Sequence, residues 1–327
     1  MSKQVAVIIP CYNSARYIPG LMESFLNQTF KDIELIIVND KSTDGTYEAI
    51  EDYRDKLASV GINLIHVEQG NNGIAEAINT GLKHVDSEFM MWMDVDDFLL
   101  PNAIEVKRQF LIDHPEYDFA LCKGYIVDET DIDKPLSIVE QRYDGKGDFF
   151  KSLILEHGIF FCGIRYFVRT SSLWKAIPTK HICGHREGQN WQLLLPLAHS
   201  CAHGYIDDIL FKYVVHNDSS SHKKRSYDET IVRRTNFIEL LTETINSLPG
   251  MEDDEKRKWI RMATNRQVYA KLLAAEDYYK KKEYKKYFRE LKKEGVKIPF
   301  KDRYFSHFCH HAANYLKRKI LRRKAGA

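Results

Sequence analysis

Three carboxylates crowd the end of one apolar run in this sequence. In MMWMDVDDFLLP, residues 90–101, the run 89–93 leads directly into Asp94, Asp96 and Asp97. Side chains two positions apart in an extended segment point to the same side, so Asp94 and Asp96 could share one cation. Their hard oxygen atoms suit Mg²⁺ or Mn²⁺, ions that often bind substrate phosphates as well. The alternative is a solvated turn in which Asp96 or Asp97 caps a helix that begins near Pro101.

The apolar runs of the first hundred residues alternate with helical patterns. Runs of five or six apolar residues are typical of buried strands, and the segments between them have the spacing of amphipathic helices. We expect strands over 5–9, 33–38, 62–67 and 89–93, and helices over 15–28, 46–57 and 74–84. This alternation predicts an α/β fold in which a mostly parallel sheet is flanked by helices on both faces.

Polar or turn-forming residues follow each predicted strand, at 10–13, 39–40, 68–72 and 94–97. Open sheets of this kind bind ligands at the carboxyl ends of their strands, so a cation at the carboxylates would face the ligand crevice. Neither of the usual glycine-rich phosphate-binding motifs occurs, so phosphate would need a metal ion instead of a backbone cradle. Residues 40–51 fit a loose EF-hand calcium loop, but the segment before them has the pattern of a strand, which argues against that reading.

The second half of the chain has a different character. Residues 117–215 mix strand and helix, with a helix expected over 189–201 and a strand over 209–215, and a polar loop follows at 216–226. Beyond the loop the pattern is helical. Residues 251–327 hold 23 Lys and Arg against 10 Asp and Glu, whereas residues 1–100 hold 7 against 16. We therefore expect one domain over 1–222 and a helical, basic C-terminal region over 223–327.

From its composition we expect a cytoplasmic globular protein. Its 327 residues are 44% hydrophobic, enough for a sizeable core. We expect neither a signal peptide nor a membrane span, since no apolar stretch reaches about 18 residues. Six scattered cysteines are expected to be free thiols. The triplets 181–185 and 199–203 alternate His and Cys, but their spacing is not that of a familiar zinc site, so we expect ordinary core or surface residues.

Four stretches together resemble the family 2 glycosyltransferases, which have the GT-A fold. They are VAVIIPCYNSARYIPGLMESFLNQTF, IELIIVNDKSTDGT, NNGIAEAINTGL and MMWMDVDDFLLP, and their order and spacing match over about residues 4–125. Similarity continues weakly to about residue 222. The resemblance implies an inverting glycosyltransferase that uses a nucleotide-sugar, here expected to be a UDP-sugar, and a divalent metal ion, Mn²⁺ or Mg²⁺.

The resemblance also implies which residues bind the donor. Pro10, Tyr12 and Asn13 would line the nucleotide pocket, with Tyr12 packing on the base. Asp40 would accept a hydrogen bond from the base. Asn79 would lie near the donor, although many relatives carry Arg at the position before it.

A second group of residues would hold the metal ion and the diphosphate. Asp94 would bind the ribose or the metal, and Asp96 would bind the metal that bridges the diphosphate. Asp97 is expected in the catalytic centre, as a contact to the donor sugar or as a support for the other two. His216, in YVVHNDSSSH, matches a family position whose His often reaches the metal or the diphosphate.

The general base is where the sequence departs from the family. Relatives commonly carry an acidic pair at the start of the helix after the donor site, but GHREGQNWQLLLP has Gln189 and Asn190 there. Neither amide can take a proton from an acceptor hydroxyl group. Glu187 is the nearest substitute, and its alternative role is that of a surface carboxylate before a helix.

The predicted partners are a nucleotide-sugar and a glycan or lipid-linked acceptor of surface polysaccharide synthesis. Apolar residues at helical spacing and a cluster of Lys and Arg over 303–324 predict an amphipathic helix on the inner face of an anionic membrane; docking on the protein is the alternative. The acidic front of the chain argues against nucleic acid. Two other functions stay open: a non-catalytic scaffold that binds sugar nucleotide or glycan, and a nucleotidyltransferase, whose glycine-rich basic loop residues 10–20 lack.

Overall fold

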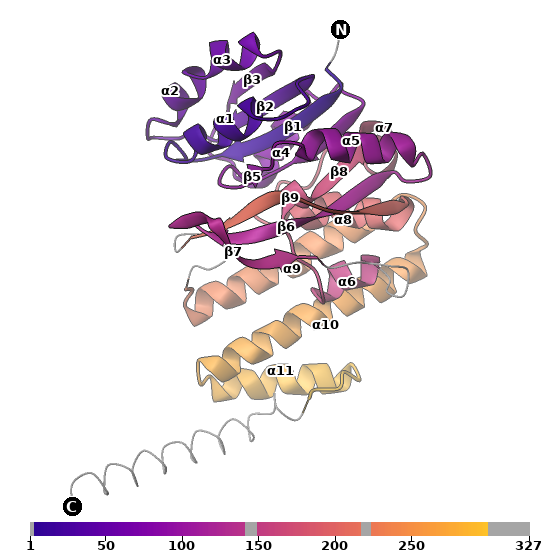
Figure 1. Ribbon diagram of the computed structural model, residues 1–327. Helices are drawn as coiled ribbons and strands as arrows, with labels where there is room; N and C mark the ends of the chain where they lie inside the picture. Colours follow the sequence, from indigo (N-terminus) through magenta and orange to yellow (C-terminus); the bar gives the residue numbers. More distant parts are fainter. Residues whose placement is uncertain (1–2, 141–148, 217–223, 300–327) are drawn as a thin grey trace, which may run out of the picture. The chain divides into compact units, whose positions relative to one another are not determined.

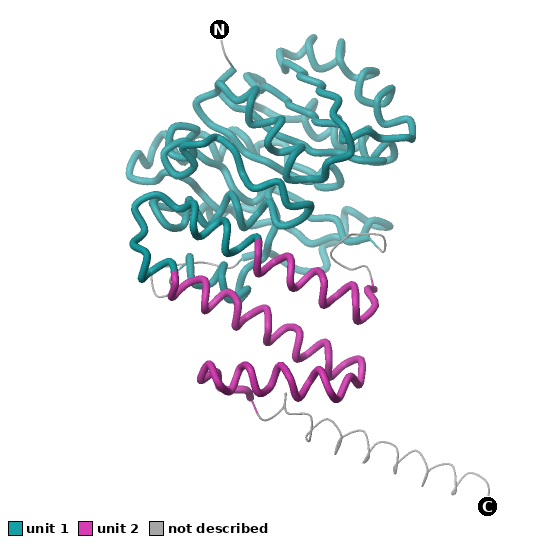
Figure 2. The backbone as a smooth tube through the Cα atoms, turned by 180° about the vertical axis from the view of Figure 1, so that it is seen from behind, with its two compact units in different colours: residues 1–223, 240–256 teal, residues 224–239, 257–327 magenta. Residues whose placement is uncertain are grey.

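The computed structural model describes residues 3–140, 149–216 and 224–299. The chain divides into two compact units, shown in different colours in Figure 2. The first comprises residues 1–223 and 240–256, and the second comprises residues 224–239 and 257–327. Helices α9 (Tyr227–Asn246) and α10 (Asp253–Asp277) each supply residues to both units. The functional boundary expected at residue 222 stays a prediction.

The first unit is built on a nine-stranded sheet (Figure 1). Its order is β3-β2-β1-β4-β8-β6-β9-β5, and β7 pairs with β6. The strands at the β3 end, up to β4, are all parallel, as predicted. Further along, β8 is antiparallel to β4 and β6, while β6 and β9 are parallel. The strands are β1 Val5–Cys11, β2 Ile33–Asn39, β3 Asn63–Glu68, β4 Phe89–Trp92, β5 Phe98–Leu99, β6 Phe119–Asp128, β7 Asp131–Val139, β8 Tyr166–Arg169 and β9 His203–Val215.

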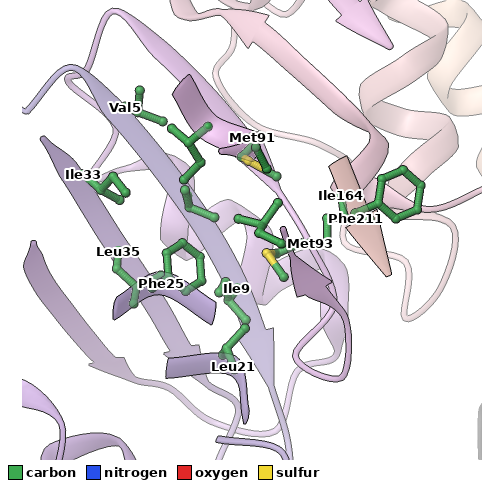
Figure 3. Packing of buried hydrophobic residues seen from close by; sticks show 14 of the residues in the cluster. Val5, Ile9, Leu21, Phe25, Ile33, Leu35, Met91, Met93, Ile164 and Phe211 are labelled. Atoms are coloured by element: carbon green, nitrogen blue, oxygen red, sulfur yellow. The ribbon is translucent and has the colours of Figure 1, made fainter. Parts of the chain in front are cut away.

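Both faces of the parallel strands are covered by helices. Figure 3 shows Leu21 and Phe25 of α1 (Ile18–Leu26) packed with Ile9 and Leu35, which point to one face of the sheet. Alternate residues of a strand point to opposite faces, so Ile8 lies on the other side. There it meets α4 (Ile74–Leu82), where a Cβ atom on Gly81 would lie 2.5 Å from Ile8 Cγ2. The helix can therefore approach the sheet closely only with glycine at this position.

The bounds of two other predicted elements differ from those in the structure. The single helix expected over 46–57 is two helices, because Tyr53 N bonds to Ile50 O three residues back and tightens the turn. The strand expected over 209–215 begins six residues earlier, at His203. The other helices are α2 Thr46–Glu51, α3 Arg54–Ser59, α5 Ala103–Asp113, α6 Phe149–Leu155, α7 Thr170–Ala176 and α8 Gln189–Ser200, with a 3₁₀ turn at Gly163–Arg165.

The described part of the second unit is helical and has its own core. Residues of α10 and α11 (Lys281–Lys293) share one buried cluster with Ile298, which follows α11. Its other members are Val268, Leu272, Ala275, Tyr284, Tyr287 and Leu291. The exposed side chains of α11 are mostly cations, namely Lys281, Lys282, Lys285, Lys286, Arg289, Lys292 and Lys293. Within the described ranges no helix is both long and apolar enough to span a bilayer. The amphipathic helix predicted over 303–324 lies outside the described residues.

Candidate active site at the carboxyl ends of the strands

The three carboxylates lie in a tight turn that follows β4. The backbone N–H of Asp97 donates to the carbonyl oxygen of Asp94 at 3.4 Å. The segment is therefore a turn, and the prediction that it is extended is wrong. The chain has to reverse here because β5, which follows at once, pairs antiparallel with β9. The turn keeps the carboxylates close enough to interact electrostatically.

The carboxylates of this turn repel one another. Burial, reinforced by the negative charge of Asp96, raises the pKa of Asp94 to about 7. Burial first, and then the charges of Asp96 and Asp94, raises the pKa of Asp97 well above its ordinary value. A proton or a divalent cation would relieve this repulsion. The donor set therefore fits a hard cation such as Mg²⁺ or Mn²⁺.

His216 lies beside this turn. Its Nε2 atom is hydrogen-bonded to Asp96 Oδ2, and its ring packs against Tyr17. The hydrogen bond to Asp96 raises the pKa of His216. Across the part of the chain that the structure describes, no three His, Cys, Asp or Glu side chains form a ready-made metal cluster. Of the predicted ligands, the structure thus joins Asp96 and His216 directly, while Asp94 interacts with Asp96 through its charge.

Asp97 is placed differently from its two neighbours. Its side chain is 1% exposed, and Oδ1 accepts a hydrogen bond of 3.1 Å from the backbone N–H of Val214. Its Oδ2 atom has no hydrogen-bond partner among the described residues. Val214 is two residues before His216, so Asp97 holds the end of β9 that presents the histidine to the turn.

The loop after β1 leaves one aromatic ring in solvent. Tyr12 is 49% exposed, whereas Pro10 is buried within β1. Asn13 has a left-handed backbone with φ of 50°, a conformation that Asn tolerates better than most residues. Its side-chain oxygen accepts from Thr43 N at 2.8 Å, and its own N–H donates to Ser42 Oγ at 2.9 Å. The loop is therefore fixed on the loop after β2, with Tyr12 projecting.

Asp40 ties the loop after β2 to the loop after β3. Oδ1 accepts from Asn72 N at 2.9 Å and from Gln69 Nε2 at 2.8 Å, and Oδ2 accepts from Gly73 N at 2.8 Å. The side chain is 5% exposed. Its carboxylate is thus occupied in shaping the loop that precedes α4, and a contact to a nucleotide base would add to these bonds.

Asn79 holds the segment that leads to the general-base candidate. From α4, its Oδ1 accepts from Ile182 N at 2.8 Å, and its Nδ2 donates to Ile182 O at 2.9 Å. Further along the segment, Arg186 donates to Asn71 at 2.9 Å and His185 pairs with Glu243 of α9 at 2.9 Å. The predicted donor contact of Asn79 stays a prediction, since its amide is engaged here.

Glu187 and the amides after it lie at the start of α8. Glu187 is exposed, and Gly188, with φ of 86°, is the last residue before α8. Asn190 accepts a hydrogen bond of 2.8 Å from Trp92 Nε1, at the end of β4. This bond links the first turn of α8 to the strand that leads into Asp94, so Glu187 stands on a segment anchored to the carboxylate turn.

Sequence reasoning missed Tyr17, Trp92 and Asp97's role as a support for β9. Tyr17 contacts a residue 199 positions away, and the Trp92–Asn190 bond spans 98 positions. No local pattern marks such pairs. The only signal in the sequence was indirect: aromatic residues close to the polar strand ends.

Comparisons with known proteins agree with this arrangement. Residues 6–176 match the family model for Glycosyl transferase family 2. A Rickettsia felis protein named as an uncharacterized glycosyltransferase is 29% identical over 272 residues, which are 80% of this chain and 42% of that protein. Chondroitin synthase of Escherichia coli is 25% identical over 252 residues, 75% of this chain and 33% of that protein. The chain spans less than half the length of these relatives.

Solved structures show the same architecture. Staphylococcus aureus TarS 1–349 superposes with a TM-score of 0.60 at 17% identity, covering 90% of this chain and 93% of that one, and the same fragment is known with UDP-GlcNAc. The mannosyltransferase PcManGT of Pyrobaculum calidifontis, solved with GDP-Man and Mn²⁺, gives 0.54 at 17% identity, covering 84% and 74%. The fold is thus the GT-A fold, and the chain, matched by the family model over more than half its length, belongs to glycosyl transferase family 2.

Proposed function

We propose that this chain is a metal-dependent inverting glycosyltransferase that moves a sugar from a UDP-sugar to a hydroxyl group of a glycan or lipid-linked acceptor in surface polysaccharide synthesis. The observation that carries the proposal is the turn at residues 94–97, where mutually repelling carboxylates meet His216 at the strand ends. The UDP-GlcNAc complex of TarS and the GDP-Man and Mn²⁺ complex of PcManGT support it by analogy of fold.

The side chains at this edge would divide the work. Tyr12 packs on the base, and Asp94, Asp96 and His216 hold the ion. A bound divalent ion supplies positive charge where the leaving diphosphate becomes more negative. Glu187 takes the proton of the acceptor hydroxyl group while the oxygen of that hydroxyl group forms a bond to the anomeric carbon. The bond from that carbon to the diphosphate oxygen breaks on the opposite side, so the configuration inverts.

Two substitutions test the assignment through release of UDP by the purified chain. Glu187→Gln removes the base, so we expect kcat to fall about 10²- to 10⁴-fold with unchanged donor affinity. Asp96→Ala removes a ligand, so donor binding should no longer respond to Mn²⁺. Glu48→Gln, which changes an exposed carboxylate of α2, is the control and should behave as wild type. Full turnover by Glu187→Gln would remove this residue from the mechanism.

One observation favours a second function, a scaffold that binds sugar nucleotide without turnover. Asn190, at a position where relatives commonly carry an acid, is used to hold Trp92. A scaffold should bind UDP-sugar with Mn²⁺, raise its melting temperature by mass action and release no UDP with any acceptor tried. UDP release that depends on an acceptor would exclude the scaffold.

We also propose that the C-terminal region places the enzyme on the inner face of an anionic membrane. Helix α11 exposes a row of cations, and the rings of Tyr278 and Tyr279 are exposed just before it. Cations and aromatic rings are also what we expect the segment 303–324 to present to a membrane. Sedimentation with vesicles tests this. The chain should pellet with phosphatidylserine vesicles at low salt and much less with neutral vesicles. Equal pelleting with both would contradict it.

A further inference from the structure

We propose that Tyr17 is a positioning residue for His216, because its hydroxyl group can accept the Nδ1 proton of the tautomer that binds a divalent cation through Nε2. The inference rests on the metal dependence proposed above and adds a residue that the family pattern did not supply. Tyr17 immediately precedes α1, and His216 follows β9. Their ring centroids are 5.4 Å apart with the planes at 40°, and Tyr17 Oη lies 3.3 Å from His216 Nδ1.

Four side chains form a continuous series of hydrogen bonds, and at one end of it Arg16 can only donate. Arg16 Nη2 donates to Tyr17 Oη, because a guanidinium group can only donate. The one proton of the Tyr17 hydroxyl group is then available for His216 Nδ1. With Nδ1 accepting, a neutral imidazole carries its proton on Nε2 and donates it to Asp96 Oδ2.

Cation binding through Nε2 needs the other tautomer. A metal ion takes the lone pair of an imidazole nitrogen, so Nε2 must give up its proton. The neutral ring then carries that proton on Nδ1 and donates it to Tyr17 Oη, while the hydroxyl proton of Tyr17 rotates away. A phenol oxygen can both donate and accept, so Tyr17 supports both tautomers of His216 with no change in the number of protons.

Burial makes this partner hard to replace. His216 is 7% exposed, so little solvent reaches its ring. Partners that orient a metal-binding His in this way typically change metal affinity 10- to 100-fold when they are removed. The simpler role for Tyr17 is packing alone, and a phenylalanine would fill that role equally well. The hydroxyl group is therefore the feature to remove.

The experiment uses the full chain with ¹⁵N-labelled histidine and Mg²⁺, which is diamagnetic. In wild type, saturation with Mg²⁺ should move the His216 proton from Nε2 to Nδ1 in ¹⁵N–¹H spectra. Tyr17→Phe should weaken Mg²⁺ binding about tenfold by calorimetry. Tyr47→Phe is the matched control, because the Tyr47 ring packs on His66 at 4.9 Å and 39°. It should leave Mg²⁺ affinity unchanged.

Two results would overturn the inference while leaving the proposed function in place. One is a His216 that keeps its proton on Nε2 in the Mg²⁺-saturated wild type, a measurement that needs no variant. The other is a folded Tyr17→Phe protein that binds Mg²⁺ as tightly as wild type. If neither Mg²⁺ nor Mn²⁺ binds the wild type at all, the metal dependence itself is wrong and the inference falls with it.

Discussion

The amide oxygen of Asn190 accepts a hydrogen bond from the indole N–H of Trp92, with 2.8 Å between the two heavy atoms. Trp92 ends β4, whose strand leads to Asp94, and Asn190 lies in the first turn of α8. The indole also stacks on Tyr166, with the two planes at 6°. Asn190 therefore has a structural task in this chain.

Asn190→Ala should leave the Trp92 indole without its acceptor and lower the free energy of unfolding by about 1 kcal/mol. Asn190→Asp keeps an acceptor oxygen and should cost less. Gln189→Ala, which alters the neighbouring amide, is the control. Urea unfolding of the three variants gives the comparison, and an Asn190→Ala protein as stable as wild type would contradict the role assigned to this bond.

Asn79→Ala should be more harmful, because it removes the hydrogen-bond partners of both the backbone N–H and the backbone C=O of Ile182. Unsatisfied buried groups cost about 1–3 kcal/mol each, so we expect a loss of about 3 kcal/mol in unfolding free energy. Asn63→Ala removes an exposed amide whose bond to Glu34 is 3.3 Å long and should cost less than about 0.5 kcal/mol. Similar losses of unfolding free energy in the two variants would show that Asn79 does not stabilise the segment around Ile182.

Glu51 should make stability depend on pH at the acid end. Two hydrogen bonds from Arg54, followed by one from His66, lower the pKa of Glu51 from 4.5 to about 2. A carboxyl group with a lowered folded pKa stabilises the fold fully above pH 4.5, and this contribution is lost as the pH falls toward 2.

Glu51→Gln should therefore destabilise the chain by about 1 kcal/mol at pH 7, a value reduced for solvent screening at this partly exposed site. The difference from wild type should shrink when urea unfolding is repeated at pH 3. Glu48→Gln, on the same helix, should show no such trend. A Glu51→Gln difference that stays constant between the two pH values would count against the assignment.

Gly188→Ala should combine two penalties. The backbone φ of 86° strains any residue with a side chain, and the new Cβ would lie 2.6 Å from Leu240 Cδ1. Gly250 has φ of 73° with no atom within 4 Å of such a Cβ, so Gly250→Ala measures the strain alone, about 1 kcal/mol. Thermal unfolding should rank Gly188→Ala clearly below Gly250→Ala. When Leu240 is also changed to Ala, the clash is removed, so the difference in melting temperature between the Gly188→Ala and Gly250→Ala proteins should become smaller.

The parallel half of the fold was predictable because its determinants are local. Strands β1 and β4 are continuous apolar runs, β2 and β3 are apolar in part, and the helices between them are amphipathic, so period and length were enough to locate them. The antiparallel strands were harder. All eight residues of β7 before Val139 are exposed, and β5 is only two residues long, so neither shows the pattern of a buried strand.

The candidate site divides in the same way. The strand-end carboxylates, Tyr12 and His216 could be chosen because residue type and family motif marked them. The hydrogen-bond partners of these side chains could not be predicted from the sequence, because the contacts join distant parts of the chain, as in Asn79 with Ile182. The turn at Asp94 also depended on a strand, β9, that begins more than a hundred residues later.

The loops after β1, β2 and β3 do not behave as independent modules. Asn13 fixes Thr43, and Asp40 fixes Asn72 and Gly73, so each loop takes part of its shape from a side chain of another. Replacing one of these loops by that of a relative would therefore leave the neighbouring loops without their hydrogen-bond acceptors. Redesign of this edge of the sheet should therefore replace the three loops together.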